Sequence, residues 1–242
     1  MTSPKELLQS WVLTQAKDLG ADQAEWVSRG LATIAETGQE RDLYMFMGLA
    51  PRRLGKADLI LTPDDLSEAE KARSGWRPCG WSIDGAARVL ALLTCPPNRP
   101  VAERFKDLRR TSDVAEMIAL YRGLPLYPEP ETLDFEVGEG LRSNIRAVFE
   151  AIAHDNPYPR DHFDDHRWNH MILKALFVES RLTPILGLRA RANPELARIL
   201  VDYAHERMAA ARQVPGDLRI PLEPFRDLPG VAAILTQREP AQ

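Results

Sequence analysis

Histidine, a common metal ligand and proton carrier, is confined to the C-terminal half of this 242-residue sequence. Three of the five histidines fall in the segment HFDDHRWNH, as His162, His166 and His170. If a helix begins just before His166, then His166 and His170 stand four residues apart on one face, the spacing of two imidazoles on one metal ion. Asp202 or Glu206, in a later helix, would complete such a site. Because no HExxH or other zinc signature is present, we favour the alternative of a solvated, histidine-rich helix start.

A lysine within an apolar segment is the second chemical candidate. Lys174 lies in the run MILKALFV, and a run that is apolar on all sides is typical of a helix surrounded by others. The lysine must then meet a carboxylate, for which Asp202 and Glu206 are candidates, or extend its amine to solvent. A desolvated amine with a lowered pKa suits a nucleophile or base, whereas an extended lysine is only structural. We favour the structural interpretation.

Two asparagines are expected on otherwise apolar helix faces. Asn144 shares its predicted face with Leu141, Ile145 and Val148, and Asn169 precedes the apolar run described above. Buried amides need hydrogen-bond partners, so they often bridge helices, although they also suit the wall of a binding cavity. The structural use is favoured for both.

Composition and missing motifs narrow the classes of function. The net charge is 31 − 35 = −4 and the basic residues are scattered, which disfavours nucleic-acid binding. The sequence contains no GxGxxG, Walker or GxSxG motif, so we expect no cofactor. Cys79 and Cys95 form no CxxC pair and are expected to be reduced thiols. The N-terminus lacks the pattern of a secretory signal, and no apolar run approaches the ~20 residues of a membrane helix. We therefore expect a soluble, cytoplasmic protein without a transmembrane segment.

Helical periodicity must position these residues. Apolar residues at helical spacing predict roughly eight to ten helices and hardly any strand. We expect an all-α fold, arranged as a helical-repeat-like (HEAT- or armadillo-like) stack of helix pairs, or alternatively as an irregular orthogonal helix bundle. A single domain over residues 1–242 is predicted. Its possible internal boundary is the Gly- and Pro-containing segment 74–81, between an N-terminal part (1–75) and a C-terminal part (82–226).

Capping residues and prolines predict where individual helices begin and end. Residues 124–138 are expected to form a proline-broken loop, followed by one long helix that carries Leu141 and Ile152. A short helix is expected at 43–47, and the segment LRIPL (218–222) is expected to form an edge strand at most. The predicted N-terminal caps are Ser3, Thr62, Ser82, Ser112 or Asp113, and Asn193.

Four segments resemble the EboA-domain family. They are LYRGLPLYPEPE (120–131), EGLRSNIRAVFEAIAHDNPYP (139–159), FDDHRWNHMILKALFVES (163–180) and LGLRARANPELARILVDYAHERMAAAR (186–212). The N-terminal third is similar to the family only in its helical character. The family pattern keeps the Trp168-Asn169 pair and the LKALF run but not histidines at 166 and 170, which argues against the metal site. The matching polar positions are the candidate ligand-binding residues: Asn144, Asn169, Lys174 and Arg207.

The resemblance implies an accessory role. The family takes its name from a bacterial operon that also encodes a UbiA-type prenyltransferase and several enzyme-like proteins. That operon is associated with making or exporting a lipophilic or secondary-metabolite precursor. We therefore expect a non-enzymatic scaffold or carrier whose partners are a small-molecule metabolite and a protein of the operon, such as the prenyltransferase. The alternative is an enzyme whose site in the C-terminal half is built on Lys174 or on histidine and carboxylate metal ligands. A membrane-surface adaptor is a third hypothesis, disfavoured by the acidic net charge.

Overall fold

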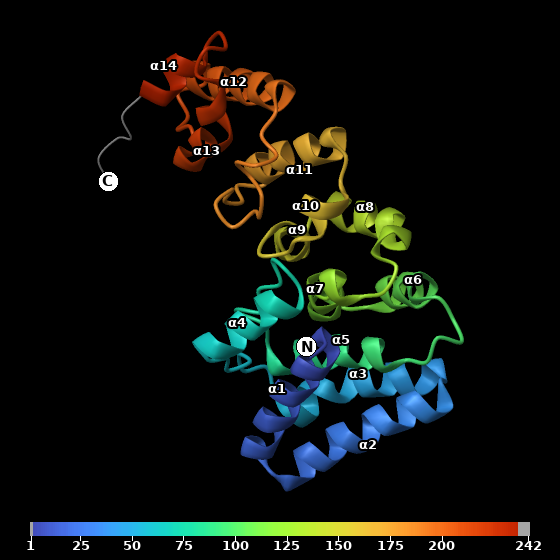
Figure 1. Ribbon diagram of the computed structural model, residues 1–242. Helices are drawn as coiled ribbons and strands as arrows, with labels where there is room; N and C mark the ends of the chain where they lie inside the picture. The colour runs from blue at the N-terminus through green and yellow to red at the C-terminus, as the bar shows by residue number, and fades with distance from the viewer. Residues whose placement is uncertain (1, 237–242) are drawn as a thin grey trace. The chain divides into compact units, whose positions relative to one another are not determined.

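The computed structural model describes residues 2–236, and within them it is built from α-helices and short 3-10 helices without a strand (Figure 1). Asp58 and Ser82 form an isolated antiparallel β-bridge, which is not part of a strand. The all-α prediction is therefore confirmed, whereas the stack of helix pairs remains a prediction. The chain divides after Asn156 into two compact units, and the expected boundary at 74–81 lies inside the first.

Nine helices form the first unit and five the second, within the described range. Those of the first unit are α1 (Pro4–Leu19), α2 (Ala21–Thr37), α3 (Glu40–Leu54), α4 (Pro63–Ala72), α5 (Ile83–Thr94), α6 (Val101–Thr111), α7 (Val114–Arg122), α8 (Asp134–Arg142) and α9 (Arg146–Ala153). Those of the second unit are α10 (Tyr158–His162), α11 (Asp165–Phe177), α12 (Pro194–Ala209), α13 (Arg219–Leu222) and α14 (Val231–Thr236). Short 3-10 helices lie at Leu124–Leu126, Pro130–Leu133, Gly216–Leu218 and Glu223–Phe225.

Local side-chain caps begin the helices where the sequence predicts them. Ser3, Thr62 and Asp113 each accept a hydrogen bond from the third helical residue and complete a capping box. Ser82 accepts from the amide of Gly85, and Asn193 accepts from that of Leu196. Of the two alternatives at the start of α7, Asp113 is therefore the cap. Capping is predictable because donor and acceptor are only three residues apart.

Helix α5 is the centre of the first unit, where it packs against α1, α2, α3 and α7. Its buried Arg88 forms an ion pair with Asp84 one turn earlier, at 2.8 Å, and both side chains are 3% exposed. The Nε of Arg88 donates to the carbonyl of Met47 in α3 at 3.1 Å, and its Nη2 lies 3.6 Å from Glu116 in α7. One desolvated guanidinium therefore links three helices.

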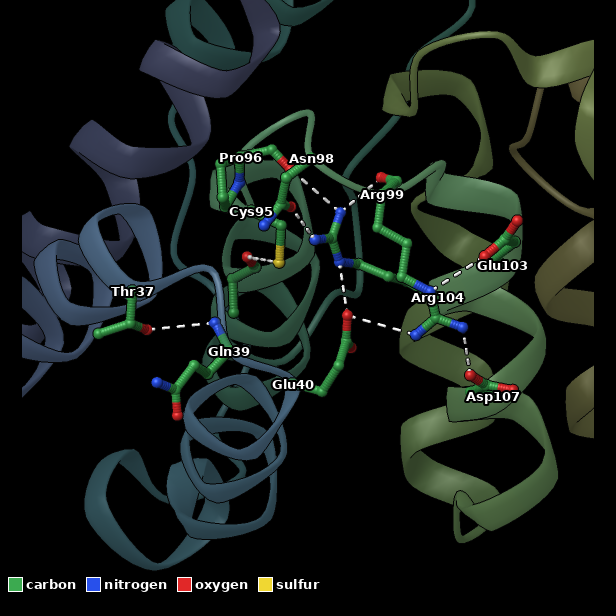
Figure 2. Close-up of polar contacts among 11 residues, drawn as sticks. Thr37, Gln39, Glu40, Cys95, Pro96, Asn98, Arg99, Glu103, Arg104 and Asp107 are labelled. Carbon is green, nitrogen blue, oxygen red and sulfur yellow. Dashed lines mark hydrogen bonds and ion pairs between the residues drawn. The ribbon is translucent and has the colours of Figure 1, made fainter.

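A second buried arginine, Arg104 of α6, holds the α5–α6 turn against α3 (Figure 2). It donates to Glu40 of α3 at 3.0 Å and to Asn98 of the turn at 2.5 Å. It also donates to the carbonyls of Pro96 and Arg99, at 3.1 and 2.7 Å. The guanidinium presents five donors in a fixed plane, so these partners fix the turn and the start of α6 together.

The single long helix expected after residue 138 is wrong, because the chain breaks between α8 and α9. Ser143 leaves the helical conformation, with φ of −55° and ψ of 140°, and its hydroxyl accepts from the amide of Ile145 at 3.1 Å. Such a local bond competes with the helical ladder. Gly140, one turn earlier, lets the ring of Tyr121 lie where a Cβ would be 2.4 Å away. The break places Asn144 in an exposed turn, not on an apolar helix face.

Two smaller expectations are also corrected. The helix expected at 43–47 extends over the whole of α3 and includes Pro51. The segment 218–222 is helical, as the end of a 3-10 turn and α13, and forms no edge strand. Both are short apolar stretches, for which packing decides between helix and strand.

In the second unit, Arg191 joins the start of α11 to the loop before α12. Its guanidinium lies 4.8 Å from the ring centroid of the buried Trp168. It donates to the carbonyls of Pro159, Arg160 and Phe163, and pairs with Asp165 at 2.9 Å. One guanidinium thereby contacts the loop between α10 and α11, the start of α11 and the ring of Trp168.

Replacing Arg88 by methionine should destabilise the first unit by about 3–5 kcal/mol, because it leaves the buried Asp84 without its cation. The double variant Asp84→Leu with Arg88→Met should recover most of that loss, since an apolar pair is left in place of an ion pair. Urea unfolding followed by circular dichroism gives the free energies. Arg142→Ala, at an exposed ion pair, is the control and should change stability by less than about 0.5 kcal/mol. A small loss in Arg88→Met would contradict a structural role for this arginine.

Candidate small-molecule groove

An open groove of about 370 Å³ runs between α2 and α3 in the first unit. This volume falls within the roughly 300–1,000 Å³ of small-molecule sites in proteins. Residues three and four apart on each helix line it, so each helix contributes one face. The lining residues are Asp22, Glu25, Trp26, Arg29, Gly30 and Thr33 of α2, and Asp42, Met45, Phe46, Leu49 and Arg53 of α3.

Two stacked aromatic rings form the apolar part of the groove. The rings of Trp26 and Phe46 are nearly parallel, with an interplanar angle of 8° and centroids 4.5 Å apart. Phe46 is buried and Trp26 is half-buried, so the indole covers the phenyl ring and remains in contact with the groove. Met45 is 50% exposed. An exposed aromatic and thioether surface of this kind binds apolar molecules with little geometric demand.

Gly30 allows this close packing of the two helices. A Cβ at position 30 would lie 2.5 Å from the Phe46 ring, too close for any ordinary contact. The phenyl ring therefore occupies space that any other residue at 30 would fill. The groove's aromatic floor depends on a glycine in the middle of a helix, where glycine is otherwise unfavourable.

Charges of both signs line the groove beside its apolar floor. Arg29 is paired with Glu25 on α2, and Asp42 accepts from the hydroxyl of Thr37 at 2.6 Å. Arg53, near the end of α3, lines the groove as well. The groove thus suits a molecule with an apolar body and a polar or charged end.

The predicted ligand-binding residues make separate local contacts, and their role in binding stays a prediction. Asn169 is 1% exposed, and its side chain exchanges hydrogen bonds with that of Asn193, at 2.9 and 3.2 Å, next to the start of α12. Arg207 donates to the carbonyl of Gln213 at 3.0 Å and lines a cavity of about 210 Å³ with Tyr203. Asn144 is exposed in the α8–α9 break described above. Of these, Asn169 bridges two segments, which is the structural use favoured from sequence.

Lys174 is half-buried on α11, and this partial burial lowers the pKa of its amine. Phe177, three residues later, is 65% exposed, so α11 is not surrounded by other helices as its apolar run suggested. Asp202 and Glu206, the carboxylates proposed to meet the lysine, are exposed on α12. A role for Lys174 as nucleophile or base stays a prediction.

His166 and His170 do share one face of α11, with ring centroids 4.3 Å apart, and both are exposed. Within residues 2–236 no group of three or more His, Cys, Asp or Glu side chains is arranged to hold a metal ion. The histidine pair accordingly remains an untested hypothesis for metal binding.

The groove residues were not singled out from sequence. Trp26 and Gly30 lie in α2, whose apolar residues follow ordinary helical spacing. Their spacing alone resembles an ordinary core-facing stripe. The available signal was the combination of a helical glycine with a tryptophan four residues before it, which indicates a close aromatic contact.

The described residues thus form an all-α protein with an open, aromatic-floored groove between α2 and α3. None of the helices in residues 2–236 has both the length and the apolar character required to cross a membrane. The family model described as metabolite traffic protein EboA matches residues 4–223, and the chain belongs to this family. The match confirms the resemblance seen at 120–212 and extends it through the N-terminal third. The family's description fits a non-enzymatic accessory role. No curated protein and no solved structure matches the chain.

Gly30→Ala should destabilise the first unit by about 1–3 kcal/mol, because the added methyl group displaces the Phe46 ring. Gly48→Ala is the matched control: it also lies within a helix, α3, and a Cβ there meets nothing within 4 Å. That control should stabilise the protein by up to about 1 kcal/mol through helix propensity alone. Urea unfolding midpoints measure both. Equal effects from the two substitutions would show that position 30 is not closely packed.

Proposed function

We propose that this protein is a non-enzymatic accessory protein that carries a lipophilic metabolite or precursor in the groove between α2 and α3. The observation that supports this most is the Trp26–Phe46 stack, which faces a groove of about 370 Å³. The family's description as a metabolite traffic protein agrees with a carrier. The polar and charged side chains beside the floor suit a ligand whose polar end stays in water.

The site of action in this proposal is the cytoplasm, and the partner is an enzyme of the same biosynthetic operon. An open groove leaves part of a bound ligand exposed, so a partner can take it up without a lid having to open. The UbiA-type prenyltransferase is the partner to test first, because its substrates are lipophilic. An enzyme built on Lys174 is the alternative, supported by the lowered pKa of its amine.

Binding of farnesol, a lipophilic isoprenoid alcohol, tests the proposal. The Met45→Lys variant places a charge beside the aromatic floor and removes apolar contact, so it should weaken farnesol binding about tenfold or more. Tyr44→Lys is the matched control, since Tyr44 is the preceding residue of α3, is also exposed, and does not line the groove. Isothermal titration gives the dissociation constants.

Tyr44→Lys should bind farnesol as the unaltered protein does. Equal weakening by the two lysines would locate the binding elsewhere, and no binding by the unaltered protein would contradict a lipophilic cargo.

A further inference from the structure

A second cavity of the first unit, of about 210 Å³, is polar and separate in its lining from the α2–α3 groove. Its walls come from the segment 77–81, from α7 and α9, and from residues 154–156. We call it the Arg77–Arg122 cleft. Its side chains with chemical capacity are Arg77, Cys79, Arg122, Glu150, His154 and Asp155.

Arg122, the last residue of α7, is the more buried of the two cations. Its Nη1 donates to the carbonyl of Gly80 at 2.7 Å, which orients the guanidinium beside the cleft. Burial lowers the pKa of Arg122, and the nearby Asp155 and Asp58 only partly oppose this effect. A guanidinium that has lost water in this way gains most from an anion that enters the same space.

Arg77 lies on the exposed segment and is paired only loosely with Asp155. The closest nitrogen-to-oxygen distance is 3.7 Å, and the two side chains are 55% and 44% exposed. This distance exceeds the roughly 2.7–2.9 Å of a charge-assisted hydrogen bond. An oxyanion that approaches Arg77 with better geometry can therefore replace the aspartate.

The wall that carries Asp155 is held in a fixed conformation. Asp155 itself has a left-handed backbone, with φ of 48°, which is uncommon for a residue other than glycine. Asn156 is buried, and its amide donates to the carbonyls of Tyr121 and Ala151 at 3.0 and 3.1 Å. The carboxylate is thus presented to the cleft by a constrained turn, with His154 beside it.

Cations predominate among the groups that are open to a ligand. Glu150 is already paired with Arg146 at 2.7 Å, outside the cleft lining. That leaves the two guanidinium groups of Arg77 and Arg122 against the carboxylate of Asp155. The balance favours an anionic ligand, and the volume limits its bound part to a compact group.

We propose that the Arg77–Arg122 cleft binds a compact oxyanion, a phosphate, diphosphate or carboxylate group, between its two arginines, in competition with Asp155. The site shares no lining residue with the α2–α3 groove, so it does not rest on the carrier function proposed above. If farnesol did not bind, the proposal of an oxyanion site in the Arg77–Arg122 cleft would still stand.

Alkylation of Cys79 by iodoacetamide reports occupancy, because this cysteine is exposed and lines the cleft. Cys95 is an internal reference: burial raises the pKa of its thiol to about 11, so it carries little reactive thiolate at neutral pH. Rates for both cysteines are measured by mass spectrometry of the digested protein. Inorganic phosphate, pyrophosphate and citrate are the probes, with sodium chloride at matched ionic strength as the control.

Pyrophosphate or citrate should slow alkylation of Cys79 severalfold and leave Cys95 unchanged. Comparison of the probes distinguishes a phosphate site from a carboxylate site. Arg77→Gln and Arg122→Gln should each weaken the protecting anion about tenfold, as judged from the concentration for half-protection. Asp155→Asn should have the opposite effect and tighten it, because asparagine tolerates the left-handed backbone while removing the competing charge.

Sodium chloride that protects Cys79 as well as the oxyanions do would overturn the proposal, as would protection that persists in both arginine variants. If circular dichroism shows that an arginine variant has lost its helical structure, the Asp155→Asn variant alone tests the proposal. Unchanged or weaker protection of Cys79 in Asp155→Asn would refute a site in which Asp155 competes with the ligand.

Discussion

The buried guanidinium of Arg88, at the centre of the first unit, is the constraint on which the packing of the surrounding helices depends. Arg88 of α5 can be buried only because Asp84, the carbonyl of Met47 and, at longer range, Glu116 surround it. Met47 follows Phe46 in α3, so the bond to this carbonyl anchors the part of α3 that carries the phenyl ring of the groove floor. Glu116 lies on α7, which ends in Arg122 of the cleft. The groove and the cleft are thus each connected to the Arg88 network, the groove through α3 and the cleft through α7.

The groove stays open because its floor is built from flat, preorganised surfaces. Trp26 lies parallel on Phe46, and Gly30 provides the space that the phenyl ring needs. A larger residue at 30 would push the helices apart or turn the ring into the groove. Within this arrangement, the conformational entropy cost of a helical glycine is offset by aromatic packing that no other residue at this position permits.

The sequence predicts the elements whose causes are local, and this accounts for most of the fold. Ser3, Thr62 and Asn193 cap helices because their partners are three residues away, and these starts are where they were expected. The break at Ser143 was missed because it depends also on a distant residue, Tyr121, whose ring packs against Gly140. Asn144 was misplaced in consequence, since a single broken turn changes the face on which a residue lies.

The candidate sites were less predictable, because the residues that form each site are far apart in the sequence. Arg77 and Asp155 come together from segments separated by about half the length of the first unit, and neither has a neighbour that marks it as part of a site. The groove presents a different difficulty, because Trp26 and Phe46 follow the spacing of core residues. Only the position of α3 beside α2 shows that their rings border open space.

The two cavities differ in what they can hold, and this difference bears on how a carrier would work. The groove offers an apolar floor with charges of both signs beside it, so a lipophilic ligand there would gain affinity from contact area and would be selected only weakly by its shape. In such a carrier, the open groove would leave part of the ligand surface in water, so the ligand would dissociate quickly. Fast release is a disadvantage for storage but suits transfer to an acceptor. The smaller cleft cannot enclose a lipophilic body, yet its arginines can distinguish an oxyanion from a neutral group. The cleft would select ligands by charge, and the groove would bind them weakly through contact area. The first unit could then recognise chemically different molecules without a closed, enzyme-like pocket.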